Sequence, residues 1–498
     1  ILELYQELGF RTLSQRIRGE FGAAVDVEES VEENPPAGGE EVSEIDIKKV
    51  GIALWLLHSD TTNPTLEDIL QFANEKKFED AQKYIYAEIK KQKLEKVLND
   101  IELPLIPVIE KMEKRGVLID KSYLKTLSKD YHKQLSALEK KIYKHAGEEF
   151  NINSPKQLGV VLFDKLELAP KNQKKTGTGA RSTKESELQK MKDMHPIIKE
   201  IFAYRELQKL LSTYIDNIPE LLDKDNRLHA KFIQTGTTTG RMSSQNPNLQ
   251  NIPIRTELGR KIRDAFIVSK GYKLVALDYS QIELRVAAFL SEDEKLIENF
   301  REGGDIHTIV ASEVFGVPID KVDSEMRREA KVINFGIQYG MGVNALKENL
   351  GTTRAEAQKY LNEYFKVFSG LSHYMHEIKL DAARLGYTET YFGRKRHFEG
   401  INSRIPYIRA MAERMAINAP IQGTQSDIIK IAMARIDDYL IKENISKDAQ
   451  LLLQVHDELV YEIKESKVEE ISKEIKKIME SVINPKDIYD IELLADVS

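Results

Sequence analysis

Two segments about 180 residues apart constrain the fold of this chain most, because each places an aspartate at the end of an apolar strand. The run 272–277 is typical of a buried strand, and Asp278 follows it directly. The runs 451–455 and 459–463 are typical of a β-hairpin with Asp457 at its tip. Both carboxylates are therefore expected on rigid backbone.

Paired carboxylates on rigid backbone indicate a site for divalent metal. Asp457 and Glu458 are costly at a hairpin tip unless a cation lies beside them. Mg²⁺ takes oxygen ligands, keeps waters and is completed by substrate phosphates, and two such ions about 3.5–4 Å apart support phosphoryl transfer. Either aspartate alone would be interpreted as a cap or turn residue. An amphipathic helix is expected to begin near Ser280.

The composition excludes several classes of protein. The 498 residues suffice for about three or four domains, and 41% hydrophobic with 31% charged residues excludes disorder across the whole chain. The sequence contains no cysteine, which excludes disulfides, thiolate nucleophiles and zinc fingers. No apolar stretch approaches the roughly 20 residues of a membrane span. We therefore expect a cytoplasmic protein without a membrane partner.

The net charge of −7 hides an uneven distribution. Ten acids and no Lys or Arg lie between Glu20 and Asp46, together with the Pro- and Gly-rich residues 34–39, which indicates a solvated linker. Without those ten acids, 73 basic residues would face 70 acidic ones. The rest of the chain is therefore compatible with a polyanionic partner such as nucleic acid.

Helical spacing of apolar residues predicts two long helices between 103 and 146, with many lysines on their polar faces. The basic, Gly-containing loop 174–183 follows them. It is interpreted equally well as a phosphate-binding loop or as a solvated connection.

A further segment carries cations and aromatic residues at steps of four. Arg327, Lys331, Phe335 and Tyr339 form one winding stripe on a predicted helix. Two cations followed by two aromatics suit a nucleoside triphosphate, with its phosphates on the cations and its sugar and base on the rings. Taken alone, the segment would be read as an amphipathic helix with solvated cations and core aromatics.

Together, three segments resemble motifs A, B and C of the family A DNA polymerases, of the bacterial polymerase I type, in the same order. They are 278–285 (DYSQIELR), 327–340 (Arg-x3-Lys-x3-Phe-Gly-x2-Tyr-Gly) and 454–458 (QVHDE). Further similar segments are 239–244, 247–253, 304–307, 392–396 and 418–424. The resemblance covers roughly residues 100 to 497.

The resemblance implies roles at the reaction centre. Asp278 and Asp457 are similar to the two catalytic metal-binding aspartates, with the carbonyl of Tyr279 as a further metal ligand and Glu458 as a secondary acid. The expected cofactor is a pair of Mg²⁺ ions, with Mn²⁺ as a substitute. The residues expected around the dNTP are Arg327, Lys331, His307, Phe335, Tyr339, Gln281, Ile282 and Glu283.

Within that set, individual roles are also implied. Lys331 is expected to donate a proton to the pyrophosphate leaving group, and Glu283 resembles the glutamate that excludes a ribose 2′-hydroxyl. Primer–template DNA is the expected partner besides dNTPs. Its expected contacts are Arg241, Asn248, Gln250, Asn251, Asn418, Gln422, His456, Arg394, Lys395, Arg396 and Lys209.

The resemblance implies an α+β fold shaped as a right hand, in which an antiparallel sheet forms the palm, helices form fingers and thumb, and a small N-terminal remnant domain precedes them. The expected divisions are 1–20 (end of a 5′-nuclease region), 21–46 (acidic linker), 47–100 (reduced 3′–5′ exonuclease remnant), 101–225 (thumb with the start of the palm), 226–282 (palm), 283–425 (fingers) and 426–498 (palm).

The implied function is template-directed DNA synthesis from dNTPs, by a monomer acting in replication and repair at the bacterial nucleoid. Only about 75 residues are available for a proofreading domain between the nuclease region and the thumb, without a companion Tyr-x3-Asp segment, so proofreading is expected to be absent. In motif B, Gln338 and Gly342 depart from the family pattern. The alternatives are a non-catalytic primer–template-binding protein and a polymerase with significant RNA-templated activity; Glu283 disfavours an RNA polymerase.

Overall fold

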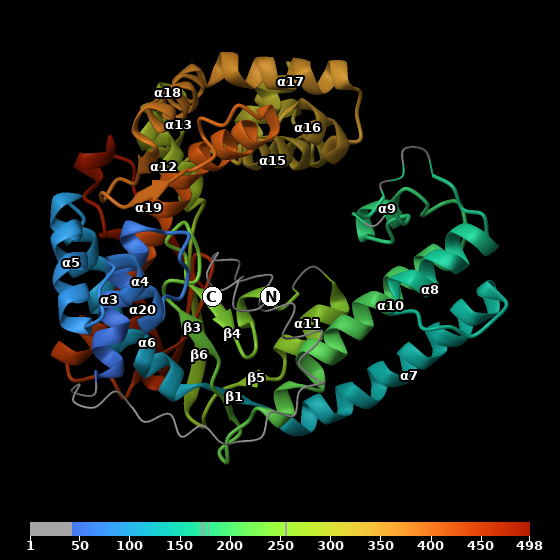
Figure 1. The fold of residues 1–498 in the computed structure, drawn as a ribbon, viewed down its shortest axis with the longest axis horizontal. Coiled ribbons are helices and arrows are strands. Elements are labelled where there is room, and N and C mark those ends of the chain that lie inside the picture. The colour runs from blue at the N-terminus through green and yellow to red at the C-terminus, as the bar shows by residue number, and fades with distance from the viewer. Residues whose placement is uncertain (1–41, 171–172, 174, 178, 254–255) are drawn as a thin grey trace. The chain divides into compact units, whose positions relative to one another are not determined.

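A four-stranded antiparallel sheet in the order β11-β6-β10-β9 brings the two aspartate segments together in the computed structural model (Figure 1). The model describes residues 42–170, 173, 175–177, 179–253 and 256–498. The strands are β6 (Tyr272–Tyr279), β9 (Ala449–Val455), β10 (Glu458–Lys464) and β11 (Ala495–Val497). The predicted strand and hairpin are both confirmed.

Helices cover one face of this sheet. α6 (Leu103–Arg115) packs on β9, and α20 (Val468–Glu480) packs on β6, β10 and β11. The long helix α19 (Pro406–Lys442) contacts both of these helices. Because side chains alternate along a strand, Tyr279 points to the covered face, where its hydroxyl donates to the Met479 carbonyl at 2.7 Å, and Asp278 points to the other.

The predicted long helices are confirmed as α6 and α7 (Lys121–Ala146). Figure 1 shows α7 running beside α10 (Ile197–Leu210), and the two helices are in contact. The other elements of this part are α8 (Pro155–Gly159), α9 (Glu185–Gln189), α11 (Glu257–Arg263), β1 (Val117–Ile119), β2 (Arg227–Leu228), β3 (Lys231–Ile233), β4 (Ser243–Gln245) and β5 (Phe266–Ile267).

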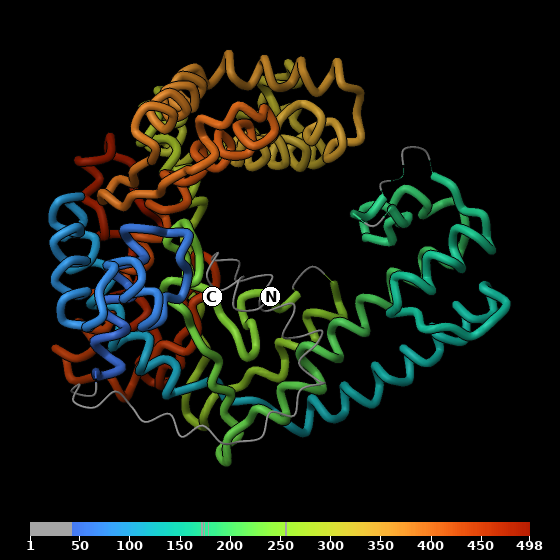
Figure 2. The backbone as a smooth tube through the Cα atoms, viewed as in Figure 1, coloured from blue at the N-terminus to red at the C-terminus, as the bar shows by residue number. Residues whose placement is uncertain are grey.

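Helices between β6 and β9 form a second group, whose yellow and orange backbone gathers together in Figure 2. They are α12 (Ile282–Ser291), α13 (Glu294–Arg301), α14 (Ile306–Phe315), α15 (Ser324–Gln338), α16 (Val343–Leu350), α17 (Arg354–Val367) and α18 (Ser369–Leu385), followed by the hairpin β7 (Tyr387–Glu389) and β8 (Lys395–His397). The helix predicted near Ser280 exists as α12, but it is buried on nearly every side rather than amphipathic, because α13, α18 and α19 all pack on it.

The N-terminal helices are α3 (Glu44–Leu57), α4 (Leu66–Ala73) and α5 (Phe78–Lys91). α3 begins two residues before the expected end of the acidic linker. Residues 1–41, which comprise the region 1–20 and most of that linker, lie outside the described residues. Residues Ile45–Ser498 form one compact unit, so the finer divisions expected from the sequence stay predictions.

A buried cluster of charges joins three distant parts of this unit. Glu102, at the end of the short helix 97–102, pairs with Lys430 of α19 at 2.7 Å and with Arg394, which precedes β8. Arg394 also pairs with Asp427 of α19 at 2.6 Å. All four side chains are at most 5% exposed. Within the part of the chain that the structure describes, each of these charges finds its opposite charge inside the cluster.

We expect Glu102→Gln to lower the free energy of unfolding by about 3–5 kcal/mol, because Lys430 and Arg394 keep their buried charges and lose a shared partner. Glu110→Gln is the matched control: Glu110 is 54% exposed and pairs with Lys48 at 3.3 Å, so the expected loss is at most about 1 kcal/mol. Chemical denaturation measures both. Equal losses in the two variants would contradict the importance of the buried cluster.

Candidate active site

Strand pairing fixes the two aspartates beside each other. Glu458 of β10 lies opposite Asp278 of β6, and the Tyr279 N–H donates to the Asp457 carbonyl at 3.2 Å. Only two residues connect β9 to β10, and His456 there has a φ of 55°, as short hairpin turns require. The predicted meeting of the two carboxylates therefore follows from the sheet register.

The two carboxylates repel one another and share an acidic neighbourhood. Burial raises the pKa of Asp278, and so does the charge of Asp496, which lies opposite it on β11. Burial and the charge of Asp278 raise the pKa of Asp457. Burial and Asp278 likewise raise the pKa of Glu458. These neighbouring carboxylates fit a divalent cation, because a bound cation takes oxygen ligands and would relieve the repulsion between them.

A cleft of about 1050 Å³ opens in front of both aspartates. One wall is α10, which contributes basic side chains, and the opposite wall is the β9–β10 hairpin. Seven residues predicted as site residues line it together: Lys209, Gln250, Asn251, Asp278, His456, Asp457 and Glu458. Sequence reasoning missed several of its cations, among them Lys192, Lys199, Arg205 and Arg263.

Amide side chains hold the hairpin turn in place. The Gln454 amide donates to the His456 carbonyl at 2.6 Å, and the Gln250 amide donates to Gln454 Oε1 at 3.1 Å. Gln425 of α19 connects this turn to Arg241: its amide donates to the His456 carbonyl at 3.5 Å, and its Oε1 accepts from Arg241 Nε at 3.2 Å. Gln425 was missed because no local pattern marks it, and only folding brings α19 to the hairpin.

Glu283, at the start of α12, is held by two residues that the sequence also singled out. Its carboxylate accepts a hydrogen bond from the Tyr339 hydroxyl and pairs with the Arg241 guanidinium. Burial and the Glu283 charge raise the pKa of Tyr339, so its hydroxyl remains a donor. The side chain of Glu283 is 10% exposed, which leaves it little freedom.

The predicted stripe lies on α15, with Tyr339 as its C-terminal cap residue. Arg327 pairs with Asp305, the N-cap of α14, at 2.6 Å. Burial opposes the ionisation of Asp305, yet hydrogen bonds from Arg327 and Thr308 prevail and lower its pKa to about 2. Lys331 lies 6.0 Å from the centre of the Phe335 ring.

His307 of α14 is buried against α15. Its ring lies 5.7 Å from that of Phe335, and its Nδ1 is 2.9 Å from the Asn334 amide. Burial lowers the pKa of His307 to about 4, which the nearby cations reinforce. The imidazole is therefore neutral in this arrangement. Asn334 and Asp305 are positioning partners that the stripe pattern alone did not mark.

The prediction that Arg394 contacts DNA is wrong. Its side chain is 5% exposed and pairs with Glu102 and Asp427 in the buried cluster, because the β7–β8 hairpin folds onto α19. Lys395 and Arg396 also make contacts within the protein but remain partly exposed: Lys395 donates to the Gln92 carbonyl at 2.9 Å, and Arg396 lies over the Phe398 ring.

The remaining predicted residues are positioned but untested. Asn248 accepts from the Gln250 N–H, Gln422 lies on α19, and Asn418 on the same helix has an Oδ1 without a partner among the described residues. Gln281 begins α12 with a φ of 53°, and Ile282 is buried. Arg181, in the loop 174–183, pairs with Asp164.

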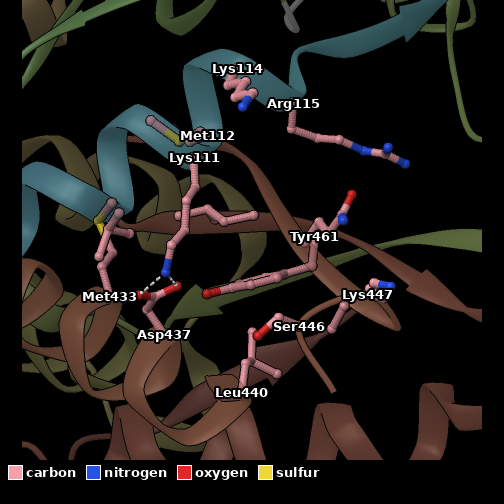
Figure 3. Close-up of a pocket in the computed structure, with 14 residues that line it drawn as sticks. Lys111, Met112, Lys114, Arg115, Met433, Asp437, Leu440, Ser446, Lys447 and Tyr461 are labelled. Carbon is pink, nitrogen blue, oxygen red and sulfur yellow. Dashed lines mark hydrogen bonds and ion pairs between the residues drawn. The ribbon is translucent and has the colours of Figure 1, made fainter. Parts of the chain in front are cut away.

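A second cavity, of about 420 Å³, is lined by residues of α6 and α19, with others from β9 and β10 (Figure 3). Apolar residues such as Met112, Met433 and Leu440 line it, and Lys111 pairs with Asp437 at 2.6 Å beside them.

Among the described residues, no cluster of three or more His, Cys, Asp or Glu side chains suited to a metal occurs. In the same residues, no helix is long and apolar enough to cross a membrane.

The model of DNA polymerase family A matches residues 121–497. The chain therefore belongs to DNA polymerase family A. It is 46% identical to DNA polymerase I of Pseudomonas aeruginosa over 388 residues, 78% of this chain and 42% of that protein. It is 47% identical to the thermostable DNA polymerase I of Thermus aquaticus over 384 residues, 77% and 46% of the two chains. The chain thus spans less than half the length of these relatives.

A solved structure supports the same conclusion about the fold. The POL domain of Pol1 from M. smegmatis, in complex with DNA primer-template and dNTP, superposes with a TM-score of 0.84 at 36% identity. The match covers 90% of this chain and 80% of that one. The α+β, right-hand polymerase fold expected from the sequence motifs is confirmed.

The buried, neutral His307 makes stability depend on pH. Its pKa of about 4 lies below the roughly 6.5 of an unfolded histidine, so the unfolded chain takes up the proton first as the pH falls. We expect this group to reduce the free energy of unfolding between pH 6.5 and 4 by up to about 3 kcal/mol, and to contribute no further change below pH 4.

Denaturation of His307→Gln and of the parent protein across this pH range measures the effect. The difference between the two should grow towards high pH. His373→Gln, at an exposed position of α18, should leave the pH dependence of the parent unchanged. A pH-independent difference for His307→Gln would contradict the neutral, buried imidazole.

Proposed function

We propose that this chain catalyses template-directed DNA synthesis, in which a primer 3′-oxygen attacks the α-phosphate of a dNTP and pyrophosphate leaves. One observation carries the proposal: Asp278 at the end of β6 and Asp457 in the turn before β10, 179 residues apart in the chain, lie beside each other and line a large cleft. Membership of DNA polymerase family A supports it. A binding protein gains nothing from two repelling carboxylates there.

Asp278 and Asp457, with the Tyr279 carbonyl, would hold two Mg²⁺ ions, for which Mn²⁺ could substitute. Bound ions would activate the attacking oxygen and stabilise the leaving one. The raised pKa values of both aspartates support a cation here, because burial and a neighbouring carboxylate oppose the ionisation of each: Asp496 for Asp278, and Asp278 for Asp457. Glu458 would act as a secondary acid.

The triphosphate would lie along α15. Arg327 is exposed at the start of the stripe and would exchange its contact with Asp305 for contacts with phosphate oxygens. Lys331 would neutralise phosphate charge and donate a proton to the pyrophosphate. A phosphate beside His307 would raise the pKa of this imidazole and favour a charged contact. Phe335, Tyr339, Gln281 and Ile282 would surround the sugar and base.

Glu283 would exclude the ribose 2′-hydroxyl. The support is its fixed position, since Tyr339 and Arg241 both hold the carboxylate at the start of α12. A rigid acid can reject an added hydroxyl both sterically and by leaving it poorly hydrogen-bonded.

Primer–template DNA would occupy the cleft. Its basic wall, with Lys209, supplies charge for phosphates, and the amides of Gln250 and Asn251 supply contacts that do not depend on sequence. Arg241, Asn248, Asn418, Gln422, His456, Lys395 and Arg396 complete the proposed set. We further propose that the chain acts as a monomer at the bacterial nucleoid and that it does not proofread.

We expect Asp278→Ala and Asp457→Ala each to lower primer extension by at least about a thousandfold, since each removes a ligand of the reacting centre. Binding of a labelled primer–template should change little. Asp225→Ala, at an exposed turn, is the control and should extend normally. Chelation of divalent cations should stop the parent enzyme, and Mg²⁺ should restore it. Normal extension by either aspartate variant would refute the proposal.

We expect Glu283→Ala to accept ribonucleotides about a hundredfold better relative to dNTPs, because the space for a 2′-hydroxyl opens. Single-nucleotide extension with matched dNTP and rNTP gives kcat/KM for each. Unchanged sugar selectivity would contradict the role of Glu283 without affecting the role of the aspartates.

A further inference from the structure

Trp55, the only tryptophan of the chain, ties the N-terminal helices to the polymerase core. It lies on α3 and is 1% exposed. Its indole Nε1 donates to the Thr237 carbonyl at 2.9 Å. Its ring lies 5.1 Å from both the Arg394 guanidinium carbon and Lys430 Nζ, which belong to the buried charge cluster.

The loop 237–241 that Trp55 contacts ends at Arg241. The Thr237 hydroxyl donates to the Arg241 carbonyl at 2.7 Å, which closes the loop on itself. Gly240 has a φ of 94°, and a Cβ there would lie 3.0 Å from Arg394 Nε. Trp55 and Arg394 therefore clamp the same short loop at two points.

The two cations beside the Trp55 ring are held in place by their ion pairs. Arg394 is fixed by Asp427 and Glu102, and Lys430 by Glu102, in a cluster at most 5% exposed. Cation–π contacts of this kind are strongest when the cation is desolvated, as both are here. The position of the loop is thus set by α3 and the buried cluster together.

Arg241, at the end of this loop, connects the position of the loop to that of Glu283. The Arg241 guanidinium pairs with Glu283 and hydrogen-bonds to Gln425 Oε1, and no other basic side chain within the described ranges pairs with Glu283. A shift of the loop would therefore release one of the two groups that hold this carboxylate, leaving the Tyr339 hydroxyl alone.

We propose that Trp55 is a positioning residue for sugar selection: it holds the loop 237–241 so that Arg241 fixes Glu283. This inference rests on the proposed role of Glu283 and extends it to a residue on an N-terminal helix. It gives α3 a function in synthesis that requires no exonuclease chemistry. Arg394, which does not contact DNA as expected, acts in the same clamp.

Trp55→Phe tests this, because phenylalanine keeps an aromatic ring beside the two cations and lacks the indole N–H. The measurement is kcat/KM for a matched dNTP and rNTP on the full chain. Loss of one hydrogen bond predicts about a fivefold fall in dNTP-over-rNTP selectivity, through better use of rNTP. Ile85→Ala, in the buried face of α5, is the control and should leave selectivity unchanged.

Two further variants keep the test decisive. Thr237→Val removes the hydroxyl that closes the loop, keeps the side-chain shape, and should lower selectivity similarly even if Trp55→Phe folds poorly. In this variant, Trp55 fluorescence reports whether the cluster stays intact. In a Glu283→Ala background, Trp55→Phe should cause no further fall, because the clamp acts only through Glu283.

Unchanged selectivity in both Trp55→Phe and Thr237→Val, with selectivity still lost in Glu283→Ala, would overturn the proposal and leave the proposed function standing. An equal loss of dNTP and rNTP use would also overturn it, since this indicates a general structural defect. Retained selectivity in Glu283→Ala would instead refute the sugar-gate role on which the inference rests.

Discussion

The antiparallel pairing of β6 with β10 is the constraint on which the rest of the structure depends. It places Glu458 opposite Asp278 and the hairpin turn beside Tyr279, so the carboxylates of two distant segments share one place. A shift of one residue would turn Asp278 to the face covered by α20 and bring Tyr279 to the cleft. The register is held because the apolar residues on the covered face cannot be exposed.

The molecule contains two different kinds of charged site. In the buried cluster of Glu102, Arg394, Asp427 and Lys430, opposite charges satisfy one another and fix three segments in place. At the cleft, burial and like charges among Asp278, Asp457 and Asp496 outweigh the favourable contacts, so the pKa values of Asp278 and Asp457 are raised. The first arrangement serves rigidity, and the second leaves a demand that a cation and a substrate would meet.

The N-terminal helices are part of the core rather than an appendage. Trp55 connects α3 to the loop of Arg241, and the helix that supplies Glu102 connects the same region to α19. The proposed role of Trp55 would make substrate selection depend on the packing of these helices. This dependence is not visible in any motif, since Trp55 and Glu283 are more than 200 residues apart in the sequence.

The sequence by itself determined the strands, the hairpin and the long helices, and it singled out the two aspartates that the fold brings together, because these features depend on local periodicity and on compact motifs such as 278–285 and 454–458. Only the tertiary structure decided which polar residues meet. It turned Arg394 from an expected DNA contact into a buried partner of Glu102, and it brought Gln425 to the hairpin turn. The reason is physical: the partner of a charge is set by packing between distant segments, which no local pattern records.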